Sequence, residues 1–573
     1  MDKKQEYGFL EEEIEKTASD NALLSIHSQE YDDSIRHSDP IAMSDGHRLK
    51  KDLKARHITM IAIGGALGTG LLIGTSTPLK VAGGGSTFIA YTIVGIVVYF
   101  VMCTLGEMCS FIPLPEGFAG YASRYCDSAL GFAVGYAYLC KYLIVSPNQL
   151  VAGSLVMQYW VSPETVNPGV WVAILLVTIT LINFFGVRFF GEFEFWLSSL
   201  KVITVVGLII VLFVIMLGGG PNHDRLGFRY WHDPGAFAPY KGIEPISKAR
   251  FVSFWSAMSN AVFAYLGIEL VSITFGEAEN PRKSIKRAIK LTFYRILFFY
   301  ILSVFLLSCT VAYNDPNLSS GGSTAAASPF VVAINNAGIK VLPHIVNACI
   351  LIFIFSASNS DLYIATRTLY GLAANGKAPK IFAKTNKNGV PVYCLGFSCL
   401  FCCLAFMVCS SSSKKIFGYF VNVVSIFGLL TWISILVTYL YFLRAVKAQG
   451  YERTKDFTYY APFQPYGAYF ALFMCILIAI TKNFTVFIHG FDYKNFITGY
   501  IGIPVYLCCL FGYKLIIKSK RVLPEEADLV TYKDVIDAEE EEGRVKDEEY
   551  KKSREGKRFD ALWFYDVFFS WLF

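Results

Sequence analysis

The stretch that decides the fold lies at residues 63–72 and reads Ile63-Gly64-Gly65-Ala66-Leu67-Gly68-Thr69-Gly70-Leu71-Leu72. Its four glycines crowd the middle of the first long apolar segment of the chain. Glycine destabilises a helix by about 1 kcal/mol relative to alanine, and it lets a ligand approach the bare backbone. In a bilayer an open backbone is tolerated only where it lines a cavity enclosed by protein. The run is therefore either a helix-packing face of small residues, which is the commoner case, or a break that binds a ligand.

The composition places the chain in a membrane. Of its 573 residues, 54% are hydrophobic and only 17% are charged. Soluble domains carry about 25% charged residues. The 14 cysteines lie almost all inside apolar segments. They are therefore interpreted as small packing residues, and neither a disulfide framework nor a metal site is predicted.

Twelve apolar segments of membrane-spanning length predict an all-α integral membrane protein with about 12 transmembrane helices. A polar N-terminal tail (1–54) precedes them and is predicted to be disordered, because it is charged and lacks apolar periodicity. The segments lie at residues 58–79, 86–112, 129–160, 169–186, 193–217, 251–275, 289–313, 341–372, 390–409, 416–443, 466–486 and 496–517.

The basic residues of the loops predict the orientation. When the N-terminal tail is placed in the cytoplasm, most loop Lys and Arg residues fall on the inner side, and residues 280–287 and 377–387 dominate this bias. The outer loop 218–250 runs against the trend, but it is long enough to form a small folded cap. Both termini are therefore predicted to be cytoplasmic, including the charged C-terminal tail (521–573).

Five charged residues lie inside the predicted helices, where a charge at mid-bilayer costs roughly 3 kcal/mol or more. Because of this cost, each is a candidate functional residue. Glu107 lies near the inner end of its segment, which favours a structural role at a cytoplasmic gate. The other four are Lys141, Lys201, Glu269 and Asp361.

The two lysines each have two interpretations. Lys141 lies in the middle of the third segment, so it is either half of an internal ion pair or the counter-ion of an anionic ligand. Lys201 follows Glu194 in the fifth segment, and the two could form a structural salt bridge. A desolvated lysine also loses its proton readily. Lys201 is then a proton carrier or a permanent substitute for a bound cation.

A second glycine interruption lies in the sixth segment, where Gly267 stands close to Glu269. The first and sixth segments begin two runs of five, and corresponding broken helices indicate a transporter built from inverted repeats. The N-terminus of a half-helix suits an anion, and exposed carbonyls suit an ammonium group. Such a site fits a zwitterion, which favours the ligand-binding interpretation of the glycine-rich run. Residues 356–361 of the eighth segment are also polar, and either line a cavity or hydrogen-bond neighbouring helices.

These motifs resemble the fungal amino acid permeases of the amino acid–polyamine–organocation superfamily. The resemblance rests on residues 64–72, 192–201, 263–269 and 276–282, and spans roughly residues 49–520. It implies a LeuT-type 5+5 inverted-repeat core with broken first and sixth helices (55–443), followed by two additional transmembrane helices (444–520). Residues 48–57, 146–150 and 218–231 are similar to permeases for dicarboxylic amino acids. This similarity implies proton-coupled uptake of glutamate and aspartate at the plasma membrane.

The resemblance also implies roles by position. Thr69 and Gly70 match positions that hold the substrate α-carboxylate, and carbonyls of the first and sixth helices match those that take the α-amine. Lys201 matches a lysine that occupies the place of a sodium ion, with either Ser356 or Ser360 beside it. The predicted substrate site comprises Ala66, Gly68, Thr69, Gly70, Lys141, Phe263, Tyr265, Leu266 and Gly267. The predicted coupling site comprises Lys201, Glu269, Ser356 and Ser360.

Lys141 is the predicted counter-ion of the acidic side chain. A buried lysine without a partner is costly, and a substrate carboxylate would relieve that cost. Asp361 argues against an acidic substrate, unless it is protonated or pairs with a cation such as Lys141 or Arg367.

Two alternatives remain: a symporter for neutral or many amino acids, and a nutrient-sensing receptor. No catalytic or phosphate-binding motif is present, so neither an enzyme nor a cofactor is expected. The predicted partners are a small amino acid, a proton and the lipid bilayer, without nucleic acid. Lysines of the N-terminal tail, such as Lys3, Lys4 and Lys16, are possible sites for ubiquitin-ligase machinery.

Overall fold

The computed structural model describes residues 68–545, except for 115, 186, 271–280, 320–327, 387–388, 489, 532, 535–536, 539–540 and 542–543. The predicted site residue Ala66 and the lysines of the N-terminal tail lie outside this part of the chain. Within it, all regular structure is helical, and the β-type pairing is confined to an isolated bridge between Asp127 and Arg521.

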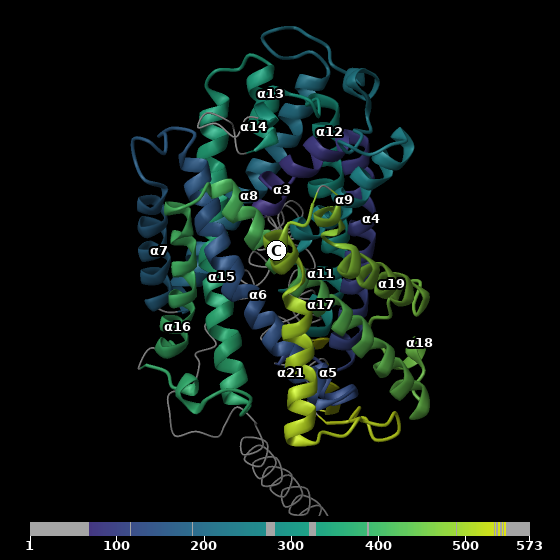
Figure 1. The fold of residues 1–573 in the computed structure, drawn as a ribbon. Helices are drawn as coiled ribbons and strands as arrows, with labels where there is room; N and C mark the ends of the chain where they lie inside the picture. Colours follow the sequence, from purple (N-terminus) through teal and green to yellow (C-terminus); the bar gives the residue numbers. More distant parts are fainter. Residues whose placement is uncertain are drawn as a thin grey trace, which may run out of the picture.

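The helices follow the apolar segments of the sequence (Figure 1). In the first half they are α3 (Thr69–Leu72), α4 (Ser76–Phe111), α5 (Gly117–Tyr125), α6 (Ser128–Met157), α7 (Pro168–Phe184), α8 (Val187–Met216), η1 (Trp231–Gly235) and α9 (Ile246–Tyr265). In the second half they are α11 (Pro281–Arg295), η2 (Ile296–Leu302), α12 (Ser303–Thr310), α13 (Pro316–Ser319), α14 (Pro329–Asn336), α15 (Leu342–Ala374), η3 (Lys380–Ala383), α16 (Val392–Cys402), η4 (Cys403–Cys409), α17 (Ser413–Ala448), α18 (Arg453–Asp456), α19 (Tyr466–Thr481), η5 (Phe484–Phe487), α20 (Tyr493–Tyr500) and α21 (Gly502–Ile517).

Nine helical stretches of the described part are long and apolar enough to cross a membrane, and α7 is a shorter apolar helix. Large apolar side chains on the outside of the bundle, such as Val177, Ile203, Phe473 and Ile516, are more than half exposed. Because such surfaces suit hydrocarbon and not water, α7, α8, α19 and α21 present them to lipid. The prediction of an all-α, multi-pass membrane protein is therefore confirmed.

The centre of the bundle is built around α6, which packs against α15 and α17, while α4 packs against α9. In Figure 1, α7 and α16 form one edge, and α13 and α14 lie at the end opposite α5 and α18. The largest fully buried side chain of the described residues is Trp432 of α17, and several buried tyrosines surround the same region. The site described below lies inside this core.

Two glycines with positive φ interrupt the helices. At Gly83 (φ 85°) α4 divides into two helices, and a Cβ there would lie 2.6 Å from the Ala236 carbonyl oxygen. At the end of α9, Leu266 is extended and Gly267 has φ 97°, so the helix stops at Tyr265. The helix thus ends at the position where the sequence predicts a break.

Candidate functional site

The short helix α3 forms the last four residues of the glycine-rich stretch and begins after Gly68, whose backbone is extended. Thr69 is buried, and its hydroxyl donates a hydrogen bond to Oε1 of Gln149 on α6 at 2.9 Å. The Thr69 carbonyl accepts hydrogen bonds from the N–H groups of Ile73 and Gly74 at 2.8 and 3.0 Å. The chain therefore turns directly after α3, in the core of the bundle.

Gly68 and Gly70 have different surroundings. A Cβ on Gly70 would lie 2.5 Å from Cα of Ala264 and 3.0 Å from the Phe263 carbonyl oxygen. Gly70 is thus required for close packing of α3 against α9. Among the described residues, nothing lies within 4 Å of a Cβ built on Gly68. The packing interpretation therefore holds for Gly70, whereas Gly68 has free space beside its backbone.

The break after α9 has an acidic side chain at its centre. The N–H of Gly267 donates to Oε2 of Glu269 at 3.2 Å, and the indole N–H of Trp432 donates to the same oxygen at 3.3 Å. The other carboxylate oxygen forms a salt bridge with Nζ of Lys141 on α6. Glu269 thus ties the interrupted segment to two neighbouring helices.

Lys141 is 1% exposed and lies over two aromatic rings of its own helix. Its Nζ is 5.2 Å from the ring centre of Tyr138 and 4.8 Å from that of Tyr142. The sequence left two interpretations of Lys141, an internal ion pair and the counter-ion of a ligand. The structure shows the internal ion pair. A role as the counter-ion of a substrate therefore requires that Lys141 exchange Glu269 for another carboxylate.

The remaining predicted residues of the substrate site lie at the same break, with different surroundings. The ring of Tyr265 stacks on Tyr300 with ring centres 4.5 Å apart, and its hydroxyl donates to the Tyr91 carbonyl. The side chain of Tyr265 therefore packs within the helix bundle. The Phe263 carbonyl accepts a hydrogen bond from the Leu266 N–H at 3.4 Å, a length at which such a bond is weak.

Asp361 contacts an amide and not a cation. Its Oδ2 accepts a hydrogen bond from Nε2 of Gln149 at 3.1 Å. In the described part of the chain no salt bridge joins Asp361 to Lys141 or to Arg367. Gln149 therefore connects Thr69 of α3 with Asp361 of α15.

The predicted coupling residues form a second buried cluster between α8 and α15. Nζ of Lys201 lies 3.4 Å from Oε1 of Glu194, so the salt bridge proposed from the sequence is present. The same oxygen accepts hydrogen bonds from Ser356 at 2.6 Å and from Ser198 at 3.1 Å. Ser356, and not Ser360, therefore shares a carboxylate with Lys201.

Glu107 lies apart from both clusters, near the C-terminal end of α4. Its carboxylate accepts hydrogen bonds from Arg453 at 2.5 and 2.8 Å, from Tyr439 at 2.9 Å and from the N–H of Ala461 at 2.9 Å. These contacts join α4 to α17 and to the segment before α19. They agree with the structural role predicted for Glu107.

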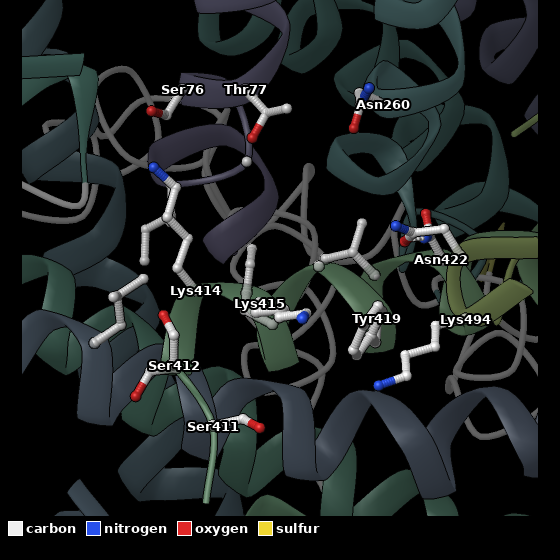
Figure 2. Close-up of a pocket in the computed structure, with 18 of the residues that line it drawn as sticks. Ser76, Thr77, Asn260, Ser411, Ser412, Lys414, Lys415, Tyr419, Asn422 and Lys494 are labelled. Carbon is white, nitrogen blue, oxygen red and sulfur yellow. Dashed lines mark hydrogen bonds between the residues drawn. The ribbon is translucent and has the colours of Figure 1, made fainter. Parts of the chain in front are cut away.

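A cavity of about 1170 Å³ opens beside the break, toward the end of the bundle that carries α13. We refer to it as the vestibule. It is lined by residues of the turn after α3, of α9, of the η4–α17 region and of the η5–α20 region (Figure 2). Phe263 also lines it, and its ring packs edge-on against Phe417 with ring centres 6.0 Å apart. The vestibule thus reaches the break at Phe263.

Sequence reasoning missed two residues of this site. Gln149 follows Pro147 and Asn148 within a membrane helix, and this polar run was the available signal. Trp432 lies in an apolar stretch of α17 with nothing nearby in sequence that marks it. No group of three or more possible metal-ligating residues occurs in the part that the structure describes.

Comparison with known proteins gives a consistent result. The profile of the family described as "Amino acid permease" matches residues 57–523. The dicarboxylic amino acid permease of Saccharomyces cerevisiae is 59% identical over 563 residues, which are 98% of this chain and 92% of that protein. The proline-specific permease of the same yeast is 40% identical, with 92% of this chain and 83% of the relative covered. Its lysine-specific permease is 39% identical, with 86% and 82% covered.

Proposed function

The chain belongs to the amino acid permease family, and we propose that it is a proton-coupled symporter that imports glutamate and aspartate. The observation that carries the proposal is the meeting of α3 with the break after α9, next to the buried pair Lys141–Glu269. Backbone atoms at the two interruptions suit the groups that all amino acids share. A cation beside them suits the carboxylate that only acidic amino acids add. The similarity to a dicarboxylic amino acid permease supports the same substrate class.

We infer that the α-carboxylate binds at Gly68, Thr69 and Gly70, with Gly68 providing the space. The start of a helix offers free N–H groups and the positive end of the helix dipole. The carbonyls of Phe263 and Leu266 would accept the α-amine, together with that of Ala66. Gly267 allows this geometry because its φ of 97° is open to glycine and rarely to other residues. In this proposal the two interruptions recognise the amino acid backbone.

The choice of an acidic side chain then rests on Lys141. In the structure this lysine is neutralised by Glu269, so the substrate carboxylate must compete with that glutamate. We propose that the substrate takes over the pairing with Lys141 and that the released Glu269 binds a proton from the outer side. A buried carboxylate without a cation is strongly favoured to be protonated. Substrate and proton would thereby enter together.

Lys201 has a different proposed role. Its ammonium group would permanently occupy the position at which sodium-coupled relatives bind a sodium ion. Ser356 and Glu194 would complete the site. The chain would then need no metal ion. We further propose a LeuT-type 5+5 arrangement in about 12 spans, a location in the plasma membrane and both termini in the cytoplasm. With this orientation the vestibule faces the outside.

A second candidate is a permease for neutral or many amino acids. One observation favours it: Lys141 already has an acidic partner and so does not require an anionic substrate. Relatives named for proline and lysine also show that the family accommodates other side chains. A purely sensory role has less support, because the sequence retains both glycine interruptions and the Lys201 cluster is present.

The test is uptake of labelled glutamate by yeast that lack their own acidic amino acid permeases, at several pH values. A panel of unlabelled amino acids serves as competitors. We expect uptake to rise as the outer pH falls and to be inhibited by aspartate far more than by proline or lysine. Equal inhibition by neutral amino acids would favour the second candidate, and uptake independent of the proton gradient would contradict proton coupling.

A further inference from the structure

The vestibule carries an excess of positive charge that the substrate site does not explain. Four lysines line it, from α17 and from the η5–α20 region: Lys414, Lys415, Lys482 and Lys494. Among its lining residues, Asp492 is the single acidic side chain. Charges on the walls of a cavity with low-dielectric surroundings focus the electric field into that cavity.

The single acidic residue is engaged mainly with the start of a helix. Asp492 caps the start of α20, where Oδ1 accepts hydrogen bonds from the N–H groups of Lys494 and Asn495 at 3.1 and 3.2 Å. Its other oxygen accepts a hydrogen bond from the side chain of Asn495 at 2.8 Å. These hydrogen bonds, and to a smaller extent the charge of Lys415, hold the pKa of the Asp492 carboxyl below its usual range. The carboxylate is thus engaged at the start of α20, and among the described residues it forms no salt bridge with a vestibule lysine.

Lys482 is the most informative of the four. It is 5% exposed, and its ammonium group donates a hydrogen bond to the backbone carbonyl of Asn422. Within the described part it has no acidic partner, although an ammonium group offers three donors. A buried cation without an anion is costly, so a carboxylate that entered the vestibule would be stabilised beside it.

The wall around Lys482 is fixed by side-chain amides. The Asn422 side chain donates to that of Asn495 at 3.1 Å, and the Asn483 side chain donates to the Asn495 carbonyl at 2.8 Å. These hydrogen bonds join the start of α17 to the η5–α20 region. Lys482 is therefore held in a built site and is not a mobile surface side chain.

Two exposed lysines face the same space. In Figure 2, Lys415 of α17 and Lys494 of α20 extend into the vestibule from opposite sides, whereas Lys414 extends toward Ser76. Like charges on facing walls repel one another, and an anion between them removes this repulsion. Lys415, Lys482 and Lys494 thus all line the cavity that an anionic ligand would enter.

We propose that the vestibule is a second, outer binding site for dicarboxylic amino acids, in which Lys415, Lys482 and Lys494 capture a substrate carboxylate. The proposal rests on the function proposed above, because it requires an anionic substrate. The captured molecule would then pass Phe263 and Phe417 to reach the break after α9. Capture of this kind raises the local substrate concentration, so it lowers the apparent KM and leaves the maximal rate unchanged.

The experiment compares initial rates of labelled L-glutamate uptake by the full chain and by Lys415→Gln/Lys494→Gln, at low and high ionic strength. Osmolarity is held constant with sorbitol, and rates are normalised to the amount of permease at the cell surface. At low ionic strength we expect the KM of the double variant to rise about fivefold, with the maximal rate unchanged. At high ionic strength the difference should disappear, because salt screens exposed charges beyond about 10 Å at 0.1 M.

Matched variants separate charge from structure. Lys415→Arg/Lys494→Arg keeps both charges and should behave as the unchanged protein. Lys455→Gln removes an exposed lysine that pairs with Glu452 near α18, away from the vestibule, and should have no effect. Lys482→Gln should raise the KM at both ionic strengths, since the buried charge is poorly screened.

Unchanged KM values in Lys415→Gln/Lys494→Gln and in Lys482→Gln would overturn the outer site and leave the proposed function intact. Failure of the unchanged protein to take up glutamate would overturn the proposed function itself, and this proposal with it.

Discussion

Lys141 and Lys201 are both buried lysines beside a glutamate, and the two pairs are built differently. Lys201 and Glu194 stand seven residues apart on one helix, and Ser356 of α15 holds the same carboxylate oxygen. Lys141 and Glu269 lie 128 residues apart, and Glu269 belongs to a segment that is not helical. A pair within one helix keeps its geometry when helices move. A pair between a helix and a break can separate, so only the second is suited to exchange partners during transport.

The largest effect is expected from Lys201→Met. If this lysine replaces a bound cation, its loss should lower the accumulation ratio of glutamate at least about 100-fold. Such a factor corresponds to a free-energy change of about 3 kcal/mol. The measurement is the steady-state ratio of internal to external glutamate, normalised to surface permease. Lys201→Met/Glu194→Gln serves as the control, because it leaves no unpaired carboxylate. Normal accumulation in either variant would show that Lys201 does not replace a bound cation.

Lys141→Gln should lower glutamate uptake about 30-fold. It should lower the uptake or binding of a neutral amino acid much less. The reason is that the proposed contact is to the acidic side chain alone. Competition curves with glutamate and proline on the same cells measure both. Equal losses for the two ligands would show that Lys141 serves the structure and not selection.

Removing both partners sharpens the comparison. Loss of one member of a buried pair costs about 3–5 kcal/mol, since it leaves an uncompensated charge, whereas loss of both is far cheaper. Lys141→Gln/Glu269→Gln should therefore regain most of the surface amount that either single change loses, yet transport glutamate poorly and without dependence on pH. Surface biotinylation and pH-dependent uptake test this. Restored pH dependence in the double variant would exclude Glu269 as the proton site.

The smallest effect concerns the serines of α15. Ser356→Ala removes a hydrogen bond of 2.6 Å to the carboxylate that Lys201 shares, and we expect about a tenfold loss of accumulation. Ser360→Ala should change accumulation less than about twofold, because no hydrogen bond of its hydroxyl is present among the described residues. The reverse order would mean that Ser360 completes the Lys201 site during transport.

Much of the fold was predictable because membrane helices have a strong local signal. The apolar segments lie close to the observed helices, and the break at Gly267 followed from a glycine beside an acid at mid-depth. The contact of Lys201 with Glu194 was also predictable, since both residues belong to one helix. These features depend on spacing along the chain alone.

The rest depended on contacts between distant segments. The pairing of Lys141 with Glu269 joins α6 to the region after α9, and the sequence left it as one of two interpretations. The different surroundings of Gly68 and Gly70 depend on where α9 passes. The vestibule lysines resemble ordinary loop charges in the sequence, and only their position around one cavity distinguishes them.

The contacts of Glu107 have a mechanical consequence. Its buried carboxylate, on α4, bonds to α17 through Tyr439 and to the segment before α19 through Arg453 and Ala461. Separating these parts would strip a charged group of its hydrogen bonds inside the protein, so they should move as one rigid body. A hinge that opens this end of the bundle is then expected between this body and the helices around α15, and α19 should move together with α4 and α17.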